Sequence, residues 1–109
     1  MYISITGIKV KSFFGMLKFM RYTVPSFTAA RKANGNLFCD SKKINKYHHT
    51  LTAWENRSKM MDYLRGKHHS SAMKNFRSIG TGSVYGYEDD LIPSWEDALK
   101  KWKENFKEI

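Results

Sequence analysis

The stretch YHHTLTAWENRSKMMDYLRGKHHSSAM, residues 47–73, decides the fold, because a strand pattern gives way to a helix pattern within it. Residues 47–55 alternate: Thr50, Thr52 and Trp54 share one side, and the residues between them share the other. A period of two is typical of a β-strand whose two faces meet different surroundings. We therefore predict a strand over these residues.

Helical spacing follows this strand. Asn56 or Ser58 is typical of an N-cap, and Gly66 is typical of a residue that ends or bends a helix. The apolar side of this helix is formed by Met60, Met61 and Leu64. Residues 70–79 supply a second helical stretch.

The N-terminal part predicts a strand and a helix. Residues 2–10 alternate and are rich in β-branched side chains, as in a strand. Ser12 is a typical N-cap for a helix that Asn34-Gly35 stops, and Pro25 is expected to kink or divide it. The apolar residues at helical spacing are Phe13, Phe14, Leu17, Met20 and Val24.

The remaining elements complete the order. Residues 36–41 pair with 47–55 as a hairpin whose connection is the basic segment 42–46, and residues 83–88 form a fourth strand. Ser94 and Asp97 have capping-box spacing at the start of a C-terminal amphipathic helix. The order βαββαβ plus a helix predicts one α+β domain over residues 1–109, with the ferredoxin-like arrangement.

Two helices cover only one face of such a sheet, so the other face needs a cover. The residues predicted there are Tyr2, Thr50, Thr52, Trp54, Tyr85 and Tyr87. Packing two such faces together predicts a homodimer that pairs as a dimeric α/β barrel. The space between sheet and helices, or between the two sheets, is then the expected pocket for a small-molecule ligand.

Charge and cysteine content limit the partners. The net charge is +9, and residues 1–50 hold nine Lys/Arg and one acidic residue, a net charge of +8. Such a field attracts anions in general. The apolar N-terminal stretch is interrupted by Lys9, Lys11 and Lys18, which argues against integral membrane association. The single cysteine, Cys39, fits a reducing compartment, so a cytoplasmic location is expected.

Several short segments together carry a family resemblance. They are His49-Thr50-Leu51-Thr52-Ala53-Trp54-Glu55, Met60-Met61, Tyr63-Leu64, Gly66, His69-Ser70-Ser71-Ala72-Met73, the run from Pro25-Ser26 through Ala29-Ala30 to Gly35, and Pro93-Ser94-Trp95. Over most of the chain, this pattern resembles the antibiotic-biosynthesis-monooxygenase-like dimeric α/β barrels, in particular spheroidene-monooxygenase-like members. The resemblance implies a ferredoxin-like protomer, a homodimer and a pocket beside the Trp-bearing strand. It leaves two cofactor states open, namely none or haem.

All four histidines fall into two doublets, His48-His49 and His68-His69. Neighbouring residues in a strand point to opposite faces, and neighbours in a helix point about 100° apart, so each doublet offers one residue to a common site. Zinc takes three or four ligands, and no nearby Cys or acid completes a known spacing. The sequence therefore predicts no metal site.

The catalytic candidates are His69, Trp54 and Arg57. His69 can exchange a proton near pH 7 and so could take one from a phenol or quinol; its alternative role is a structural hydrogen bond. Trp54 could form a wall and a hydrogen-bond donor, or simply pack in the core. Arg57 could pair with a substrate anion, or remain a solvated residue at a helix start.

The predicted substrate-binding residues are His48, Thr50, Thr52, Tyr85 and Tyr87. Together these features predict a monooxygenase-like protein that acts on a small electron-rich substrate, anionic, aromatic or polyene. The second hypothesis is a non-catalytic homodimer that binds a small molecule or serves a structural role. The third is a basic RNA-binding module with an aromatic sheet surface; it ranks last because residues 83–88 lack the leading basic residue, Gly and aromatic of an RNP segment.

Overall fold

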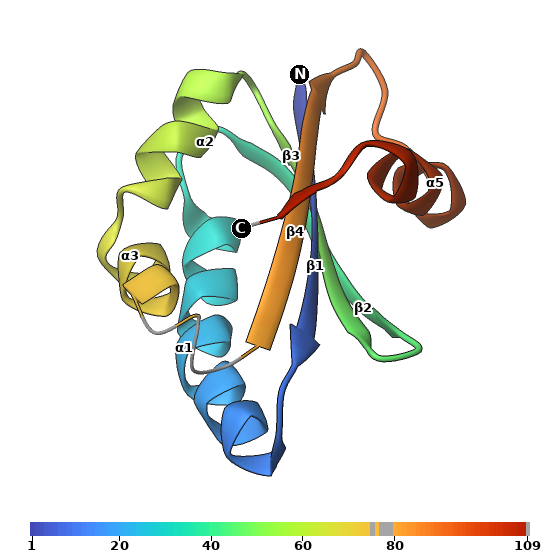
Figure 1. Ribbon diagram of the computed structural model, residues 1–109. Coiled ribbons are helices and arrows are strands. Elements are labelled where there is room, and N and C mark those ends of the chain that lie inside the picture. Colours follow the sequence, from blue (N-terminus) through green and yellow to red (C-terminus); the bar gives the residue numbers. More distant parts are fainter. Residues whose placement is uncertain (75, 77–79, 109) are drawn as a thin grey trace.

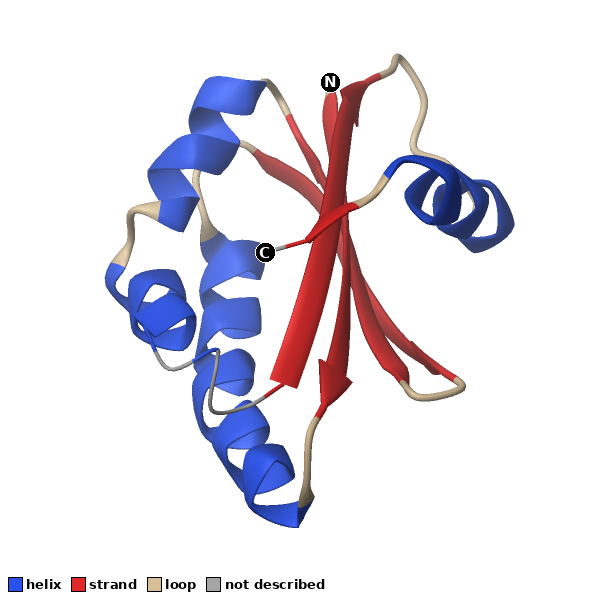
Figure 2. Cartoon of the chain, viewed as in Figure 1, coloured by secondary structure: helices blue, strands red, loops and turns tan. Residues whose placement is uncertain are grey.

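The computed structural model describes residues 1–74, 76 and 80–108, and it places a single antiparallel sheet between two helical layers (Figures 1 and 2). The strands are β1 (Tyr2–Val10), β2 (Asn36–Ile44), β3 (Tyr47–Trp54), β4 (Gly80–Glu88) and β5 (Lys107–Glu108). The helices are α1 (Phe13–Lys32), α2 (Arg57–Leu64), α3 (Lys67–Lys74) and α5 (Trp95–Asn105).

The sheet order is β2-β3-β1-β4-β5, and every neighbouring pair is antiparallel. This confirms the predicted α+β class and the ferredoxin-like arrangement. The structure adds β5, which pairs with β4 after α5. Two residues are too few to show alternation, so no pattern in the sequence indicated this strand. The predicted helix over 70–79 begins earlier, at Lys67, and its part at 75 and 77–79 lies outside the described residues.

Helix α1 begins where predicted but is not divided. The Ser12 hydroxyl accepts a hydrogen bond from the Gly15 amide at 3.1 Å and so caps the first turn. Pro25 lies inside one continuous helix of 20 residues, so the predicted division is wrong. Proline removes one backbone hydrogen bond, but the helix is held on both sides of it by buried Phe19 and Ala30.

Two left-handed residues set the ends of β2. Gly35 has φ 87° and follows the end of α1, as predicted for a helix stop. Asn45 has φ 55° and starts a two-residue turn between β2 and β3. Because this turn is so tight, most of the predicted connection 42–46 is strand instead, and β2 extends to Ile44.

The register shows which residues share a face. Ile3 and Ile5 of β1 lie opposite Ala53 and Leu51 of β3, and all four are buried beneath Ala98 of α5. The α5 face of the sheet therefore carries the aliphatic core. Helices α1, α2 and α3 lie on the other side of the sheet (Figure 1).

The predicted assignment of the two faces needs correction. Tyr2 and Trp54 are register partners, and both pack with Ala30 of α1 and Met60 of α2. Thr50 and Thr52 share their parity and therefore also face the α1–α3 layer. The face that was expected to await a partner chain is instead partly covered by α5 of the same chain.

Helix α5 sits tightly on that face. The Ser94 hydroxyl accepts a hydrogen bond from the Asp97 amide at 3.2 Å, which confirms the predicted cap. A Cβ built on Gly7 would stand only 2.5 Å from the Trp102 ring, so the indole approaches β1 because position 7 has no side chain. Trp95 Nε1 donates to the Asp40 carboxylate at 2.9 Å, which ties α5 to β2.

Candidate functional site

The first histidine doublet is split between the two faces, as alternation predicted. His49 is buried on the α5 face, where its ring meets Trp102 edge-on at 4.8 Å and its Nδ1 lies 3.0 Å from the Thr6 carbonyl oxygen. His48 lies on the opposite face, with its ring 4.6 Å from that of Phe19 of α1. Only His48 is therefore on the same side of the sheet as α3, which carries the second doublet.

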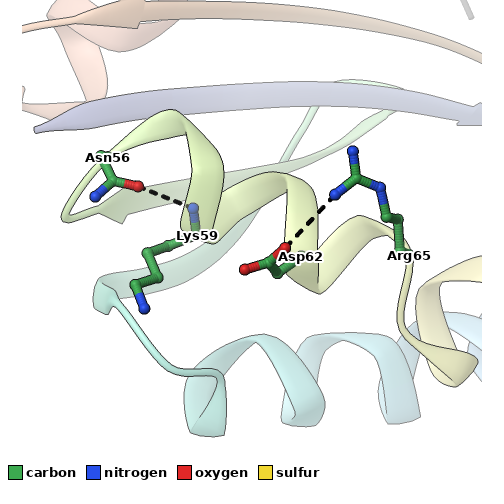
Figure 3. Close-up of polar contacts among 4 residues, drawn as sticks. All are labelled: Asn56, Lys59, Asp62 and Arg65. Carbon is green, nitrogen blue, oxygen red and sulfur yellow. Dashed lines mark hydrogen bonds and ion pairs between the residues drawn. The ribbon is translucent and has the colours of Figure 1, made fainter.

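Helix α2 brings a tyrosine over the end of β3. Its N-cap, Asn56, accepts a hydrogen bond from the Lys59 amide at 3.0 Å (Figure 3). Asp62 and Arg65 form an ion pair at 3.5 Å, but both side chains are exposed, so the pair contributes little to stability. The cap fixes where α2 begins, and one side of the helix then presents Tyr63 to the sheet.

Three rings form an aromatic stack between the sheet and the helices. Trp54 of β3 lies parallel to Tyr63 of α2, with ring centroids 5.2 Å apart and an interplanar angle of 27°. The His69 imidazole of α3 meets the Tyr63 ring edge-on, and these two ring centroids are also 5.2 Å apart. We call Trp54, Tyr63 and His69 the aromatic stack; two of its members were predicted as catalytic candidates.

Tyr63 was missed by the sequence analysis, and so was its partner Ser26. The Tyr63 hydroxyl donates to the Ser26 carbonyl oxygen at 2.9 Å, and the two hydroxyls lie 2.7 Å apart. Ser26 is buried in α1, so this pair ties α1 to α2 across the stack. Both residues lie in segments that carry the family resemblance, but neither the helical spacing of Tyr63 after Met60 nor the position of Ser26 beside Pro25 indicated a place at the site.

A row of hydroxyl groups continues from the stack along the sheet. We call Ser4, Thr6, Thr50 and Thr52 the hydroxyl row; they come from paired positions of β1 and β3. The Trp54 indole N–H donates to Thr52 Oγ1 at 2.9 Å, and the Thr6 and Thr50 hydroxyls share a short hydrogen bond. All four residues are only half-buried although they lie on central strands, so the helices do not seal this row from solvent.

His69 is the titratable member of this site. Burial lowers its pKa below the usual value of a histidine, because the charged imidazolium loses hydration. A hydrogen bond to the Leu64 backbone raises the pKa by a smaller amount, so the net direction is down. Nδ1 is buried and has no partner of good hydrogen-bond geometry among the described residues. The imidazole is therefore neutral at pH 7 and offers a lone pair or an N–H inside the protein.

Acidification should destabilise the fold. Burial also lowers the pKa values of His48 and His49, so at pH 5–7 the unfolded chain, with histidine pKa values of about 6.5, binds more protons than the native chain. We expect the free energy of unfolding, measured by urea titration, to fall steadily from pH 7 to pH 5. His69→Gln should show a shallower fall, and a native state that gained stability on acidification would contradict these pKa directions.

The other predicted residues do not join the stack. Arg57 is exposed on the first turn of α2. Tyr85 and Tyr87 face α5, because they pair with Ile5 and Ile3, and their rings stack on each other at 5.5 Å. Lys101 of α5 lies 4.3 Å from the centre of the Tyr87 ring.

Tyr87 also has a buried hydroxyl without a partner among the described residues, and burial raises its pKa. Lys101 of α5 lies over the ring of Tyr87, so this helix covers part of the aromatic side of β4. Tyr85 and Tyr87 thus lie on the far side of the sheet from His69, while His48, Thr50 and Thr52 lie on the same side as it.

The donor set does not fit a metal or a haem. No three His, Cys, Asp or Glu side chains in the described part of the chain are placed to hold a metal ion. A haem iron takes an axial ligand such as histidine. His69, a candidate ligand on this side of the sheet, packs against the Tyr63 ring, and its Nδ1 is buried.

A separate cavity of about 510 Å³ lies at the other end of the sheet, on the α5 side. Its lining residues are Lys11, Tyr47, Phe76, Gly80, Thr81, Gly82, Ser83, Trp102, Phe106 and Glu108. It is an open hollow without a histidine in its lining. We therefore place the candidate site at the aromatic stack and the hydroxyl row, where the titratable group is.

The fold is that of a ferredoxin-like α+β protein, and the candidate site, with its titratable histidine and its hydroxyl row, lies between the sheet and the α1–α3 layer. A proposed antibiotic biosynthesis monooxygenase from Deinococcus radiodurans has this fold, with a TM-score of 0.72, 16% identity, and coverage of 86% of this chain and 97% of that one. A second from Nitrosomonas europaea gives a TM-score of 0.72, 14% identity, and coverage of 84% and 100%.

SnoaB, a cofactor-independent oxygenase from Streptomyces nogalater, gives a TM-score of 0.69, 8% identity, and coverage of 85% and 97%. No protein-family model matches the chain, and no curated protein matches it in sequence. At these identities the likeness establishes the fold alone. The chain has the fold of the antibiotic-biosynthesis-monooxygenase-like proteins, which confirms the resemblance predicted from the sequence at that level.

Proposed function

We propose that the protein is a cofactor-independent monooxygenase that acts on a small, electron-rich phenolic or quinol-type substrate. The observation that carries this proposal is the His69 imidazole, which packs edge-on against Tyr63 and has a buried Nδ1 without a hydrogen-bond partner among the described residues. A neutral imidazole can accept a proton from a substrate that reaches the aromatic stack. The likeness of the fold to SnoaB supports the same class of reaction.

In the proposed reaction, His69 removes a proton from a ring methylene made acidic by the adjacent hydroxyaromatic system. The resulting carbanion transfers one electron to dioxygen, and the two radicals combine to a peroxide. The imidazolium returns its proton as the peroxide loses water. One oxygen atom then remains in the product as a carbonyl, the other leaves as water, and dioxygen is the oxidant.

The Thr6–Thr50 pair is the proposed stabiliser of the substrate anion. Two hydroxyl groups that share one hydrogen bond use one of their two protons, so one O–H of the pair can donate to a ligand. The Trp54 N–H is already bonded to Thr52, and Arg57 is exposed, so neither is needed for this role. Trp54 serves instead as the buried wall behind Tyr63.

Oxygen uptake tests the proposal. We expect a panel of anthrones and other hydroxyaromatic compounds that carry a ring methylene to include at least one compound whose oxidation the protein accelerates, also after exhaustive dialysis against a chelator. With ¹⁸O₂, one labelled oxygen atom should appear in the product. If panel compounds bind the protein but consume oxygen no faster than they do in buffer alone, the proposed reaction is wrong and a ligand-binding role is left.

The predicted homodimer remains a prediction, because it rests on no contact within the chain. Helix α5 covers part of the face on which the predicted pairing relied, so a partner would have to pack around this helix. Native mass spectrometry of the same preparation gives the assembly mass and any bound organic molecule.

A further inference from the structure

The outward side of α1 carries a row of exposed apolar side chains. These are Phe13 (73% exposed), Phe14 (76%), Leu17 (55%), Met20 (51%) and Val24 (50%), which we call the outer stripe. Residues 13, 17, 20 and 24 follow helical spacing and so lie on one line along the helix, with Phe14 beside it. Large apolar side chains gathered in this way on a surface mark a site of interaction.

The outer stripe is not a misplaced core face, because α1 already has one. Gly15, Phe19, Ser26 and Ala30 are its buried residues, and they also recur at helical spacing, on the side that faces the sheet. The inner side holds the aromatic stack through Ser26. Helix α1 is thus apolar on two sides, and the residues that the described part of the chain buries are on the inner one.

The charge around the outer stripe is of one sign. Helix α1 contains no acidic residue, and the first acid of the chain is Asp40. Lys18 and Arg21 lie beside the stripe at 100° per residue, and Arg31 and Lys32 occupy the last turn. A second copy docked through the same surface would bring these cations together, so the stripe is ill suited to pairing with itself.

We propose that the outer stripe of α1 docks the protein on an anionic bilayer surface. The apolar side chains would enter the region between head groups and acyl chains, and Lys18 and Arg21 would meet the lipid phosphates. Within the described residues, no helix is long and apolar enough to cross a membrane, so α1 lies in the plane of the interface. This inference does not depend on the proposed oxygenase reaction.

Vesicle sedimentation tests the docking surface. The full chain should pellet with vesicles of phosphatidylcholine and phosphatidylglycerol in equal parts, and far less with phosphatidylcholine alone. Leu17→Glu should weaken binding to the anionic vesicles on the order of tenfold or more, because a carboxylate would have to enter the interface. Leu91→Glu is the matched control, because Leu91 is 74% exposed and lies outside α1. This variant should bind the vesicles as the wild type does.

Three results would overturn the proposal. The first is binding to the anionic vesicles that Leu17→Glu and Leu91→Glu reduce equally, and the second is no binding at all. The third is a wild-type oligomer, seen by size-exclusion chromatography, that does not bind vesicles and that Leu17→Glu alone dissociates; the stripe would then be an interface between copies. Circular dichroism confirms that both variants are folded, and oxygen uptake without vesicles reports separately on the catalytic proposal.

Discussion

His69→Gln should reduce oxygen consumption with an accepted substrate by about 10²–10⁴-fold, the usual contribution of a positioned general base. Glutamine approximates the size of the imidazole and can still form hydrogen bonds, but it cannot take a proton at neutral pH. The loss should appear in kcat rather than in KM, because the ring position and the hydroxyl row are unchanged.

The pH dependence separates a catalytic role of His69 from a structural one. Because burial lowers its pKa, wild-type activity should be flat at pH 7 and decline only on acidification below about 6.5, whereas the residual activity of His69→Gln should lack this decline. His49→Gln is the matched control, since it makes the same replacement on the opposite face of the sheet. Full turnover in His69→Gln, or an equal loss in both variants, would refute His69 as the base.

Trp54→Ala should lower the free energy of unfolding by about 3–5 kcal/mol, as is usual when a large buried aromatic side chain is removed. Trp54 is 1% exposed and is the largest fully buried side chain of the described residues. Its removal takes the stacking partner from Tyr63 and leaves a cavity between β3 and α2. Urea unfolding followed by far-UV circular dichroism measures the change.

A loss of this size is a large part of the stability of a small domain, so a milder variant is also needed. Trp54→Phe keeps an aromatic ring over Tyr63 but removes the hydrogen bond to Thr52. It should lower the free energy of unfolding by less than Trp54→Ala does: on the order of 1 kcal/mol for the hydrogen bond, with a further loss for the smaller ring. If Trp54→Ala cost no more than Trp54→Phe, the stack would not be the packing centre of this face.

Alternation along strands correctly predicted which residues within one strand share a face. It separated His48 from His49, grouped Thr50, Thr52 and Trp54, and paired Tyr85 with Tyr87, all as the register has it. It also placed both groups on one face, which is wrong. A period of two fixes which residues of one strand share a side, but the relative parity of two strands depends on their register, which no local pattern contains.

Long-range contacts explain what the sequence did not predict. Tyr63 looks like one more helical aromatic residue until Ser26, 37 positions earlier, is placed against its hydroxyl. The apolar spacing of α1 correctly predicted a helix, but the exposed side carries five large apolar residues, whereas the buried residues are Phe19 and the small Gly15, Ser26 and Ala30. Hydrophobicity alone therefore could not indicate which side of α1 faces the sheet.

The edges of the sheet affect how the protein behaves at high concentration. β2 is one edge strand; a bulge interrupts its register between Asn36 and Phe38, and Lys42 and Lys43 are exposed near its turn. The other edge is formed by β4 together with β5, whose two residues pair only with Ser83 and Val84 among the described residues. An irregular and charged edge such as β2 is a poor template for an added strand, so growth by edge-to-edge pairing is expected to start from β4.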